Sequence, residues 1–308
     1  MKSQTFDVAV AGHFAIDTIR LPSRSKPFVV LGGSVTYISF ITKILDGTVS
    51  IISKVGGDFP ESYIWLLREE GINLSAVTKL KRAGTTRFDL KYSKDLSRRS
   101  LKLESKAPPI KLSNLPKSLL AKAVHIAPIA GEISYEIVKK LKRSADILSL
   151  DPQGLLRRFG KTGRVTLSSS IDKRLFRLIN VYKSSFNEIH AITGHSDINL
   201  AINAIHDFGV KTVVVTMGAK GAVLSVEKTV YKIPACSSRV VVDPTGAGDV
   251  FIGGFLTEYI RQKDSFWCAC VGSAAASLVI EGIGPTFFGE KEEIYQRANS
   301  IYEKEIKT

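Results

Sequence analysis

Apolar positions along the chain follow two different periods. Short apolar runs at 6–11 and 49–55 are typical of buried strands, and helical spacing over 35–45 and 60–70 predicts two helices, the second ending before Gly71. Beyond residue 123 the two patterns alternate regularly. Strands are predicted at 123–127, 146–150, 178–183 and 211–216, and helices at 132–143 and 186–193. Such alternation predicts a parallel sheet covered by helices.

Two segments depart from this series. Residues 84–92 and 100–103 alternate apolar and polar positions on either side of a polar stretch, which predicts a hairpin. Residues 19–31 alternate irregularly around Pro22 and Pro27, as expected of short exposed strands. We therefore expect a small β-sheet beside a mainly parallel α/β core.

The most restrictive pattern is the nonapeptide at 243–251, Asp-Pro-Thr-Gly-Ala-Gly-Asp-Val-Phe. Pro244 cannot lie inside a helix, and Gly246 and Gly248 allow a tight turn that comes close to a ligand. Because the later apolar residues recur at helical spacing, the helix N-terminus falls on the turn of Gly246, Ala247 and Gly248. Its free N–H groups and the helix dipole make a site for an anion, best of all a phosphate.

Asp249 lies in the first turn of this predicted helix. A carboxylate there can accept a proton from a hydroxyl beside the phosphate, which is the work of a general base. The alternative is a purely structural helix whose dipole favours an acid in its first turn. An Asp directly after Gly-Ala-Gly, with Asp-Pro-Thr before it, is far more restrictive than a lone glycine turn, so the catalytic interpretation is preferred.

Composition narrows the class of protein. The chain has 308 residues, of which 44% are hydrophobic, enough for one large α/β domain with a small appendage. Its longest nearly uncharged apolar run, 268–280, is too short to span a bilayer. Residues 6–12 look like a strand rather than the apolar core of a signal peptide, so we expect a cytoplasmic protein with no membrane partner.

The formal net charge of +14 raises the question of nucleic-acid binding. Basic clusters are spread over many predicted helices and loops without interleaved aromatic residues, which favours solvated faces and no nucleic-acid partner. A nucleic-acid-binding protein would show a steep salt dependence of affinity. A positive field also attracts anionic nucleotides.

The nonapeptide closely resembles the second signature of the ribokinase-like (PfkB) carbohydrate kinase family, and weaker motifs follow in that family's order from residue 6 to about residue 286. The resemblance implies a ribokinase-like three-layer α/β/α core with a mainly parallel sheet and a small β-sheet lid. It assigns residues 1–17, 32–83 and 107–308 to the core, and 18–31 and 84–106 to the lid. It also implies ATP and Mg²⁺ as cofactors, Asp249 as catalytic base, and the backbone of Gly246 to Gly248 as the anion hole.

The same resemblance assigns residues to the acceptor. Asp17 follows the first strand and aligns with an Asp that grips substrate hydroxyls, and Gly32-Gly33 resembles the family's first substrate motif. Tyr37 stands where ribokinases proper place an Asn, which argues against ribose; its flat apolar face and its hydroxyl are expected to contact the acceptor. Gln153 can bind ring hydroxyls both as donor and as acceptor.

Other motifs resemble the family's nucleotide site. Thr216-Met217-Gly218-x-x-Gly221 resembles the loop that binds nucleotide phosphates, with Lys220 able to reach them. The alternative is a plain turn into the strand expected at 221–226. Small residues in the helix predicted at 265–280 would let a purine or another helix pack closely.

The family's Asn-x-x-Glu, whose Glu lies near Mg²⁺ through water, aligns with Ser185 and Glu188. An alternative register uses Asn187 and puts His190 in the place of the Glu; we prefer the carboxylate because hydrated Mg²⁺ favours oxygen ligands. Asp243 and Thr245 align with positions that bind a monovalent cation in some members, which makes K⁺ a candidate.

Together these residues predict an ATP-dependent phosphotransferase acting on a hydroxyl of a sugar or polyol. Three segments look more like the inositol kinase branch than the ribokinase branch: Gly32 to Tyr37, Lys183-Ser184-Ser185 and the segment around Gln153. Myo-inositol is therefore favoured as the acceptor. A nucleoside kinase and a 2-keto-3-deoxy sugar acid kinase remain alternatives. A nucleotide-binding regulator without turnover is the alternative from another class. The resemblance also makes a homodimer through the lid a candidate assembly.

Overall fold

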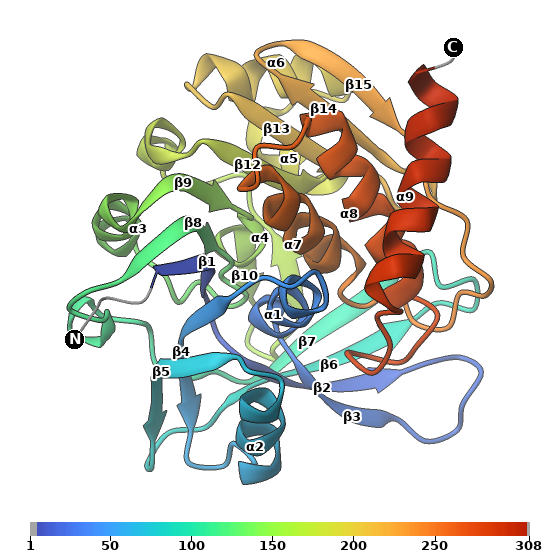
Figure 1. Cartoon of the computed structure of the whole chain (residues 1–308). Helices are drawn as coiled ribbons and strands as arrows, with labels where there is room; N and C mark the ends of the chain where they lie inside the picture. The colour runs from blue at the N-terminus through green and yellow to red at the C-terminus, as the bar shows by residue number, and fades with distance from the viewer. Residues whose placement is uncertain (1–4, 307–308) are drawn as a thin grey trace.

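The computed structural model of the chain describes residues 5–306, and Figure 1 shows it as a central sheet covered by helices. That sheet has nine strands in the order β15-β14-β13-β12-β9-β8-β1-β4-β5. Its strands are β1 (Thr5–Ala11), β4 (Val49–Gly56), β5 (Asn73–Leu80), β8 (Leu120–Ile126), β9 (Ala145–Leu150), β12 (Val181–Ser185), β13 (Thr212–Thr216), β14 (Ala222–Val226) and β15 (Thr229–Ile233). Strands β14 and β15 run antiparallel to their neighbours and the other pairs are parallel, so the predicted mainly parallel sheet is confirmed.

Helices cover both faces of this sheet. They are α1 (Ser34–Ile44), α2 (Glu61–Glu69), α3 (Tyr135–Leu141), α4 (Gln153–Leu156), α5 (Phe186–Thr193), α6 (Ile198–Asp207), α7 (Ala247–Tyr259), α8 (Ser265–Val279) and α9 (Lys291–Ile306). Side chains alternate between the faces of β1: Val8 and Val10 pack with α1, α7 and α8, whereas Ala9 and Ala11 pack with α3, α5 and α6. The three-layer α/β/α core is therefore confirmed. No helix in the described part of the chain has both the length and the apolar character needed to cross a membrane.

A second sheet of four strands lies against one end of the core. Its order is β3-β2-β6-β7, and its strands are β2 (Ala15–Arg20), β3 (Phe28–Gly32), β6 (Thr86–Tyr92) and β7 (Arg99–Ser105). A short hairpin of β10 (Arg157–Phe159) and β11 (Val165–Leu167) lies beside β7. The small sheet begins at Ala15, three residues before the predicted lid boundary. Of the predicted core ranges, residues 1–4 and 307–308 lie outside the described residues.

The position of Asp17 differs from the prediction in one respect. We expected it at the carboxyl end of the first core strand, but β1 ends at Ala11 and Asp17 lies inside β2, where it is the register partner of Val30 and Phe88. The chain leaves the main sheet at Gly12, where a Cβ would come within 2.2 Å of the Ala127 carbonyl oxygen. Asp17 is thus carried by the small sheet.

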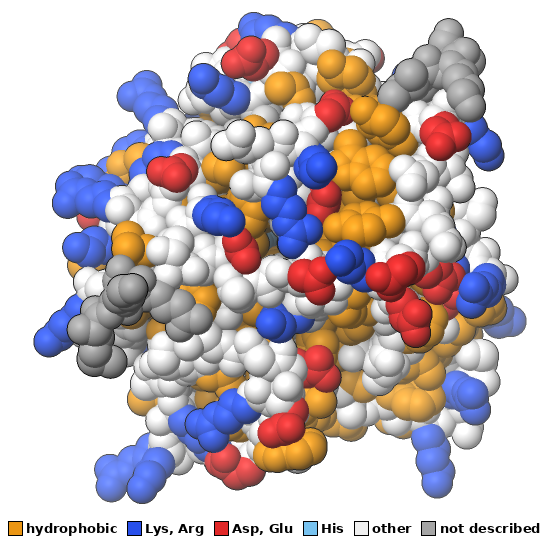
Figure 2. Space-filling model, in the orientation of Figure 1, with side chains coloured by type: hydrophobic (Ala, Val, Ile, Leu, Met, Phe, Trp, Pro, Cys, Tyr) orange, Lys and Arg blue, Asp and Glu red, His pale blue; other side chains and the backbone are white. Residues whose placement is uncertain are grey.

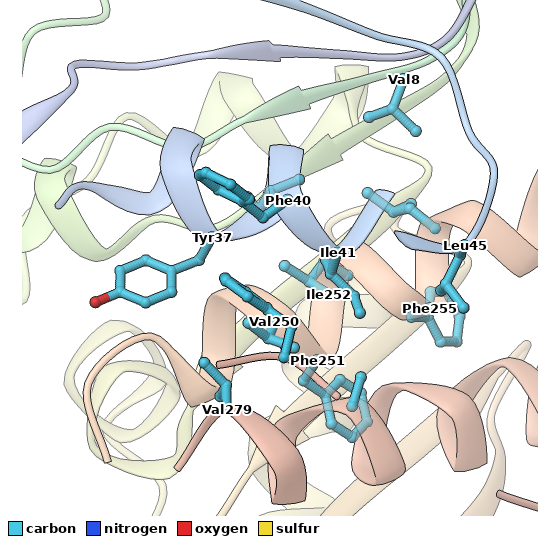
Figure 3. Packing of buried hydrophobic residues seen from close by; sticks show 14 of the residues in the cluster. Val8, Tyr37, Phe40, Ile41, Leu45, Val250, Phe251, Ile252, Phe255 and Val279 are labelled. Carbon is cyan, nitrogen blue, oxygen red and sulfur yellow. The ribbon is translucent and has the colours of Figure 1, made fainter. Parts of the chain in front are cut away.

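The helix that begins at Ala247 is held on all sides. In Figure 3, apolar side chains of α1 such as Ile41 lie against Val250 and Ile252 of α7. On the side of α8, a Cβ at Gly272 would come within 2.7 Å of the Phe251 carbonyl oxygen, so the two helices pack closely. Packing against α7 therefore accounts for at least part of the small-residue pattern of α8.

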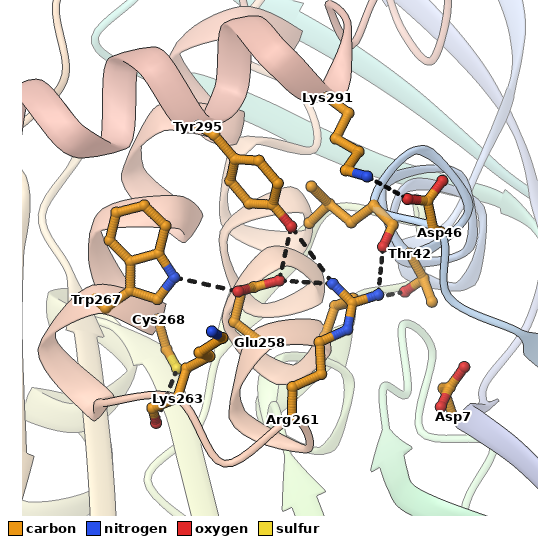
Figure 4. Close-up of polar contacts among 12 residues, drawn as sticks. Asp7, Thr42, Asp46, Glu258, Arg261, Lys263, Trp267, Cys268, Lys291 and Tyr295 are labelled. Carbon is orange, nitrogen blue, oxygen red and sulfur yellow. Dashed lines mark hydrogen bonds and ion pairs between the residues drawn. The ribbon is translucent and has the colours of Figure 1, made fainter.

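At its other end α7 is fixed by a buried carboxylate. Glu258 is 3% exposed, and it accepts hydrogen bonds from Arg261 Nη1 at 2.7 Å, Tyr295 Oη at 2.9 Å and Trp267 Nε1 at 3.1 Å. Arg261 also donates to the carbonyl oxygen of Leu45, at the end of α1. Figure 4 shows these contacts joining α7 to its three neighbouring helices.

We predict that Glu258→Ala lowers the free energy of unfolding by about 3 kcal/mol, because it leaves the Arg261 guanidinium without its carboxylate. Urea unfolding measures the loss. Glu61→Ala is the matched control: Glu61 is exposed and pairs with Lys79 at the surface, so its removal should leave the urea midpoint unchanged. Equal midpoints for the two variants would contradict the structural role of Glu258.

Candidate active site

A cavity of about 1270 Å³ opens where the carboxyl ends of β9, β12 and β13 meet the small sheet. The predicted site residues line it, except Gly32 and Asp243, which lie directly behind its wall. Parallel strands place their carboxyl ends at one edge of the sheet, and ligands of open α/β sheets bind there. On the face in Figure 2, Lys and Arg side chains are scattered among acidic and neutral ones.

The turn at the start of α7 has the geometry of an anion site. Gly246 precedes the helix with φ +81°. The Ala247 amide donates to the Pro244 carbonyl oxygen at 3.4 Å, and the Val250 amide donates to the Gly246 carbonyl oxygen at 2.8 Å. The amides of Gly248 and Asp249 lie between them in the first turn, where a helix offers no intrahelical acceptor. A Cβ at Gly246 would lie 2.2 Å from the ring of Tyr37, and one at Gly248 would lie 2.8 Å from Lys183 Nζ. The turn is therefore packed between an aromatic ring and a cation, and its three residues line the cavity.

Lys183 is a site residue that the sequence prediction did not assign. Its Nζ donates to Asp151 Oδ2 at 2.6 Å, and both side chains are buried. Burial lowers the pKa of Lys183, but the charges of Asp151 and Asp249 outweigh this effect and hold the pKa above its usual value. Lys183 thus places a fixed positive charge beside the turn. Its sequence signal was the Lys183-Ser184-Ser185 motif, which gave no indication of where the ammonium group lies.

Asp249 faces the cavity from the first turn of α7, as predicted. Its Oδ1 accepts a hydrogen bond of 3.3 Å from Gln153 Nε2, which also donates to Ser34 Oγ at 2.7 Å. Burial raises the pKa of Asp249; Lys183 lowers it and Asp151 raises it, and the net effect is a raised pKa. A raised pKa makes the ionised carboxylate a stronger base.

The acceptor end of the cavity is built on Asp17. A Cβ at Gly32 would come within 2.0 Å of Asp17 Oδ2, and Gly33 has φ +85°, so both glycines are needed where they stand. Burial raises the pKa of Asp17 to about 7, although Arg99 and Arg157 act to lower it. Within the described chain, Asp17 Oδ1 is a buried atom with no hydrogen-bond partner.

Tyr37 differs from the prediction. Its ring is 1% exposed and packs beneath Gly246, so the flat apolar face that we expected to meet the acceptor is already covered. Figure 3 shows its hydroxyl pointing away from the apolar cluster, and among residues 5–306 this buried oxygen has no hydrogen-bond partner either. The hydroxyl is the part of Tyr37 that remains for a ligand.

Ser185 and Glu188 form a capping box at the start of α5. The amide and hydroxyl of Ser185 each donate to Glu188 Oε2 at 2.7 Å. Burial and the charge of Asp151 raise the pKa of Glu188. Glu188 lines the cavity, whereas His190 of the alternative register is exposed and bonds to the carbonyl oxygen of His195. A carboxylate at this place fits a hydrated Mg²⁺.

The loop after β13 reaches the same cavity. Residues 218–220 form one turn of 3₁₀ helix, and this turn lines the cavity together with Thr216. Gly221 has φ +83°, and a Cβ there would come within 2.1 Å of the Ile233 carbonyl oxygen. Gly221 is therefore required by its positive φ and by close packing against the backbone of residues 233–235.

Asp243 orders the chain just before the anion site. Its Oδ1 accepts bonds from the amide and hydroxyl of Thr245, and its Oδ2 accepts from the Gly284 amide at 2.9 Å. The hydroxyl of Thr245 also lies 2.7 Å from Tyr92 Oη on the small sheet. These contacts explain the buried Asp structurally; a cation at Asp243 and Thr245 stays a prediction.

Comparison with known proteins decides the family. The model of the pfkB family carbohydrate kinases matches residues 7–292. The chain belongs to the pfkB family. This carbohydrate kinase is a phosphotransferase with an alcohol group as acceptor, which confirms the predicted family and enzyme class.

Relatives of this pfkB kinase differ in their named acceptors. Cytidine kinase of Thermococcus kodakarensis is 28% identical over an alignment of 281 residues that covers 90% of this chain and 97% of the relative. Inositol 3-kinase of Arabidopsis thaliana is 26% identical and covers 91% of this chain and 76% of its own. A solved pyrophosphate-dependent kinase of the ribokinase family, complexed with a pyrophosphate analog and myo-inositol, has a TM-score of 0.79 at 22% identity, covering 94% of this chain and 99% of its own.

For this pfkB kinase we predict that Asp249→Asn lowers kcat by about a hundredfold to ten-thousandfold, because an amide cannot take the hydroxyl proton. Nucleotide affinity, measured by calorimetry, should change little. Asp207→Asn is the control, since Asp207 pairs with Lys228 at the surface and should leave kcat unchanged. A near-normal kcat for Asp249→Asn would refute its assignment as the base.

Proposed function

We propose that this kinase transfers the γ-phosphoryl group of ATP to a hydroxyl of a cyclic polyol, myo-inositol in the first place. The observation that carries the proposal is a pair of buried oxygens, Asp17 Oδ1 and Tyr37 Oη, that have no partner within the described chain. The residues that carry them, Asp17 and Tyr37, both line the cavity that Asp249 faces. Buried polar groups without partners are costly, and a polyhydroxylated ring offers donors and acceptors to both.

The side chains then have distinct tasks. Asp17 accepts hydrogen bonds from acceptor hydroxyls and orients them toward Asp249, which takes the proton of the attacking hydroxyl. The amides of Gly246 to Gly248, with Lys183 beside them, hold the charge that develops on the transferred group. Mg²⁺, when bound, neutralises phosphate charge, and Glu188 is the residue that would hold it through water. The small sheet acts as a lid that excludes competing water.

ATP is favoured over pyrophosphate as donor by the shape of the cavity. Beyond the phosphate turn it continues along the small and apolar side chains of Met217, Ala235, Ala276 and Ile280, where a flat purine fits. Pyrophosphate would leave that wall unused. The nucleotide is proposed to contact Thr216, Gly218, Lys220, Gly221 and Ser185. A K⁺ site is proposed at Asp243 and Thr245.

A nucleoside is the second candidate acceptor. The inner face of the small sheet presents Phe88, Leu90 and Leu101 to the cavity, and an apolar wall of this kind suits a planar base. The likeness to cytidine kinase supports the same alternative. An acidic sugar is a weaker candidate that would use Arg99 and Arg157. The presence of Asp249 at the cavity argues against a regulator without turnover.

Assembly and location remain proposals. We place a homodimer contact at the free edge of the small sheet, because β3 is an edge strand and carries Val29 with 60% exposure. A cytoplasmic location suits an enzyme that consumes ATP.

One prediction from the proposed function concerns the pH dependence of acceptor binding. Because Asp17 has a pKa of about 7, it is protonated below that pH and loses acceptor capacity for substrate hydroxyls. The Kd of the acceptor should rise as pH falls, approaching about tenfold per pH unit below 7. Calorimetry between pH 6 and 8 measures it. Asp17→Asn should bind weakly with no such dependence; an identical pH profile in the variant would show that another group is responsible.

The second prediction tests the function itself. In an assay of ADP release with ATP and Mg²⁺, kcat/KM should favour myo-inositol over ribose, fructose 6-phosphate and nucleosides, because a site of buried polar groups rejects analogues that leave them unpaired. A clear preference for one of these three would overturn the proposed acceptor and retain the kinase. Phosphorylation of myo-inositol with pyrophosphate but not ATP would overturn the donor. The absence of ADP release with every acceptor would favour a nucleotide-binding regulator without turnover.

A further inference from the structure

A chain of hydrogen bonds leads from a guanidinium to Asp249. Arg157, the first residue of β10, donates from Nη2 to Gln153 Oε1 at 2.7 Å and from Nη1 to the Ile129 carbonyl oxygen at 2.8 Å. Gln153 in turn donates from Nε2 to Ser34 Oγ at 2.7 Å and to Asp249 Oδ1 at 3.3 Å. Protein groups therefore occupy both ends of the Gln153 amide, which we had expected to bind the acceptor.

The chemistry of the three groups fixes the direction of donation along this series of hydrogen bonds. A guanidinium only donates, and an ionised carboxylate only accepts. The amide oxygen of Gln153 must therefore face Arg157, and its NH₂ group must face Asp249. Without Arg157 the amide group of Gln153 would be free to flip and place its oxygen next to Asp249. The amide oxygen and the carboxylate, both acceptors, would then repel each other.

Arg157 is itself held in place by its surroundings. Its guanidinium lies over the ring of Phe88, with 5.5 Å between the guanidinium carbon and the ring centroid. Among the ion pairs of residues 5–306 none involves Arg157, and the acceptors of its two hydrogen bonds, Ile129 O and Gln153 Oε1, are neutral oxygens. A stacked, planar donor of this kind is preorganised, so few rotamers are lost in holding Gln153.

We propose that Arg157 is a positioning residue that orients the base Asp249 through Gln153. The inference rests on the proposed function, in which Asp249 takes the acceptor proton. Arg157 does not touch the reacting atoms in this scheme. Gln153 connects the two, so its amide serves the base rather than the acceptor.

The experiment is a double-mutant cycle in the full-length chain. Arg157→Met and Gln153→Met keep a long side chain of similar apolar bulk but remove the hydrogen bonds that connect Arg157, Gln153 and Asp249, which we call the relay. Each should lower kcat about tenfold to a hundredfold, since a misplaced catalytic group has costs of this order. The acceptor KM should change less than kcat. The double variant should be no slower than the slower single variant, because both act on one path.

Two further variants sharpen the result. Arg157→Lys keeps a donor but not the planar fork, so its kcat should lie between wild type and Arg157→Met. Arg158→Met is the control, because Arg158 bonds to the carbonyl oxygens of Leu155, Arg157 and Ser170 away from Asp249, and kcat should stay unchanged.

Several outcomes would overturn the inference. A rise in acceptor KM with unchanged kcat in Arg157→Met would show that the guanidinium binds the acceptor. Losses that multiply in the double variant would show independent roles. If Arg157→Met does not fold, an unchanged kcat in Gln153→Met is decisive against the relay. A wild-type chain that turns over no acceptor refutes the proposed function before any variant is made.

Discussion

The ion pair between Lys183 and Asp151 is the interaction on which this site depends. It joins β12 to the residue that follows β9, with 2.6 Å between Nζ and Oδ2, and both side chains are buried beside the first turn of α7. Asp249 and Glu188 lie close enough for their charges to act on Lys183. Without the ammonium group, the carboxylates of Asp151, Asp249 and Glu188 would lie near one another without this positive charge, and like charges repel. The buried cation therefore makes it feasible to keep a base and a metal-proximal acid beside a phosphate site.

The parts of the fold that the sequence predicts well are those buried on both faces. The strands at the centre of the sheet, such as β1 and β13, are covered on both sides, so their apolar runs are unambiguous. Strand β15 is exposed over four of its five residues, and β5 is only partly buried, so neither edge strand carries a clear period. The placement of Asp17 in the small sheet depends on pairing between β2 and β6, some seventy residues apart in sequence, which no local pattern reports.

For the site, backbone geometry is easier to predict than the positions of long side chains. Gly33, Gly221 and Gly246 stand where positive φ or close packing excludes a Cβ, and glycines of that kind are visible in a sequence. Lys183 and Arg157 were missed because their charged groups lie several bonds from the backbone and meet their partners through tertiary contacts. For Tyr37 the sequence predicted a residue of the acceptor site. It could not predict that the ring packs under the glycine turn at Gly246, because this is a tertiary contact.

The small sheet and the anion site share a contact that bears on the end of the catalytic cycle. Tyr92 Oη lies 2.7 Å from the hydroxyl of Thr245, and Thr245 is held by Asp243 just before the glycine turn. If products leave by displacement of the small sheet, that bond must break, and the loop behind the transferred group loses one of its restraints. Product departure and relaxation of the phosphate-holding loop would then be one event rather than two, so the turn would be reassembled each time the sheet closes over a new acceptor.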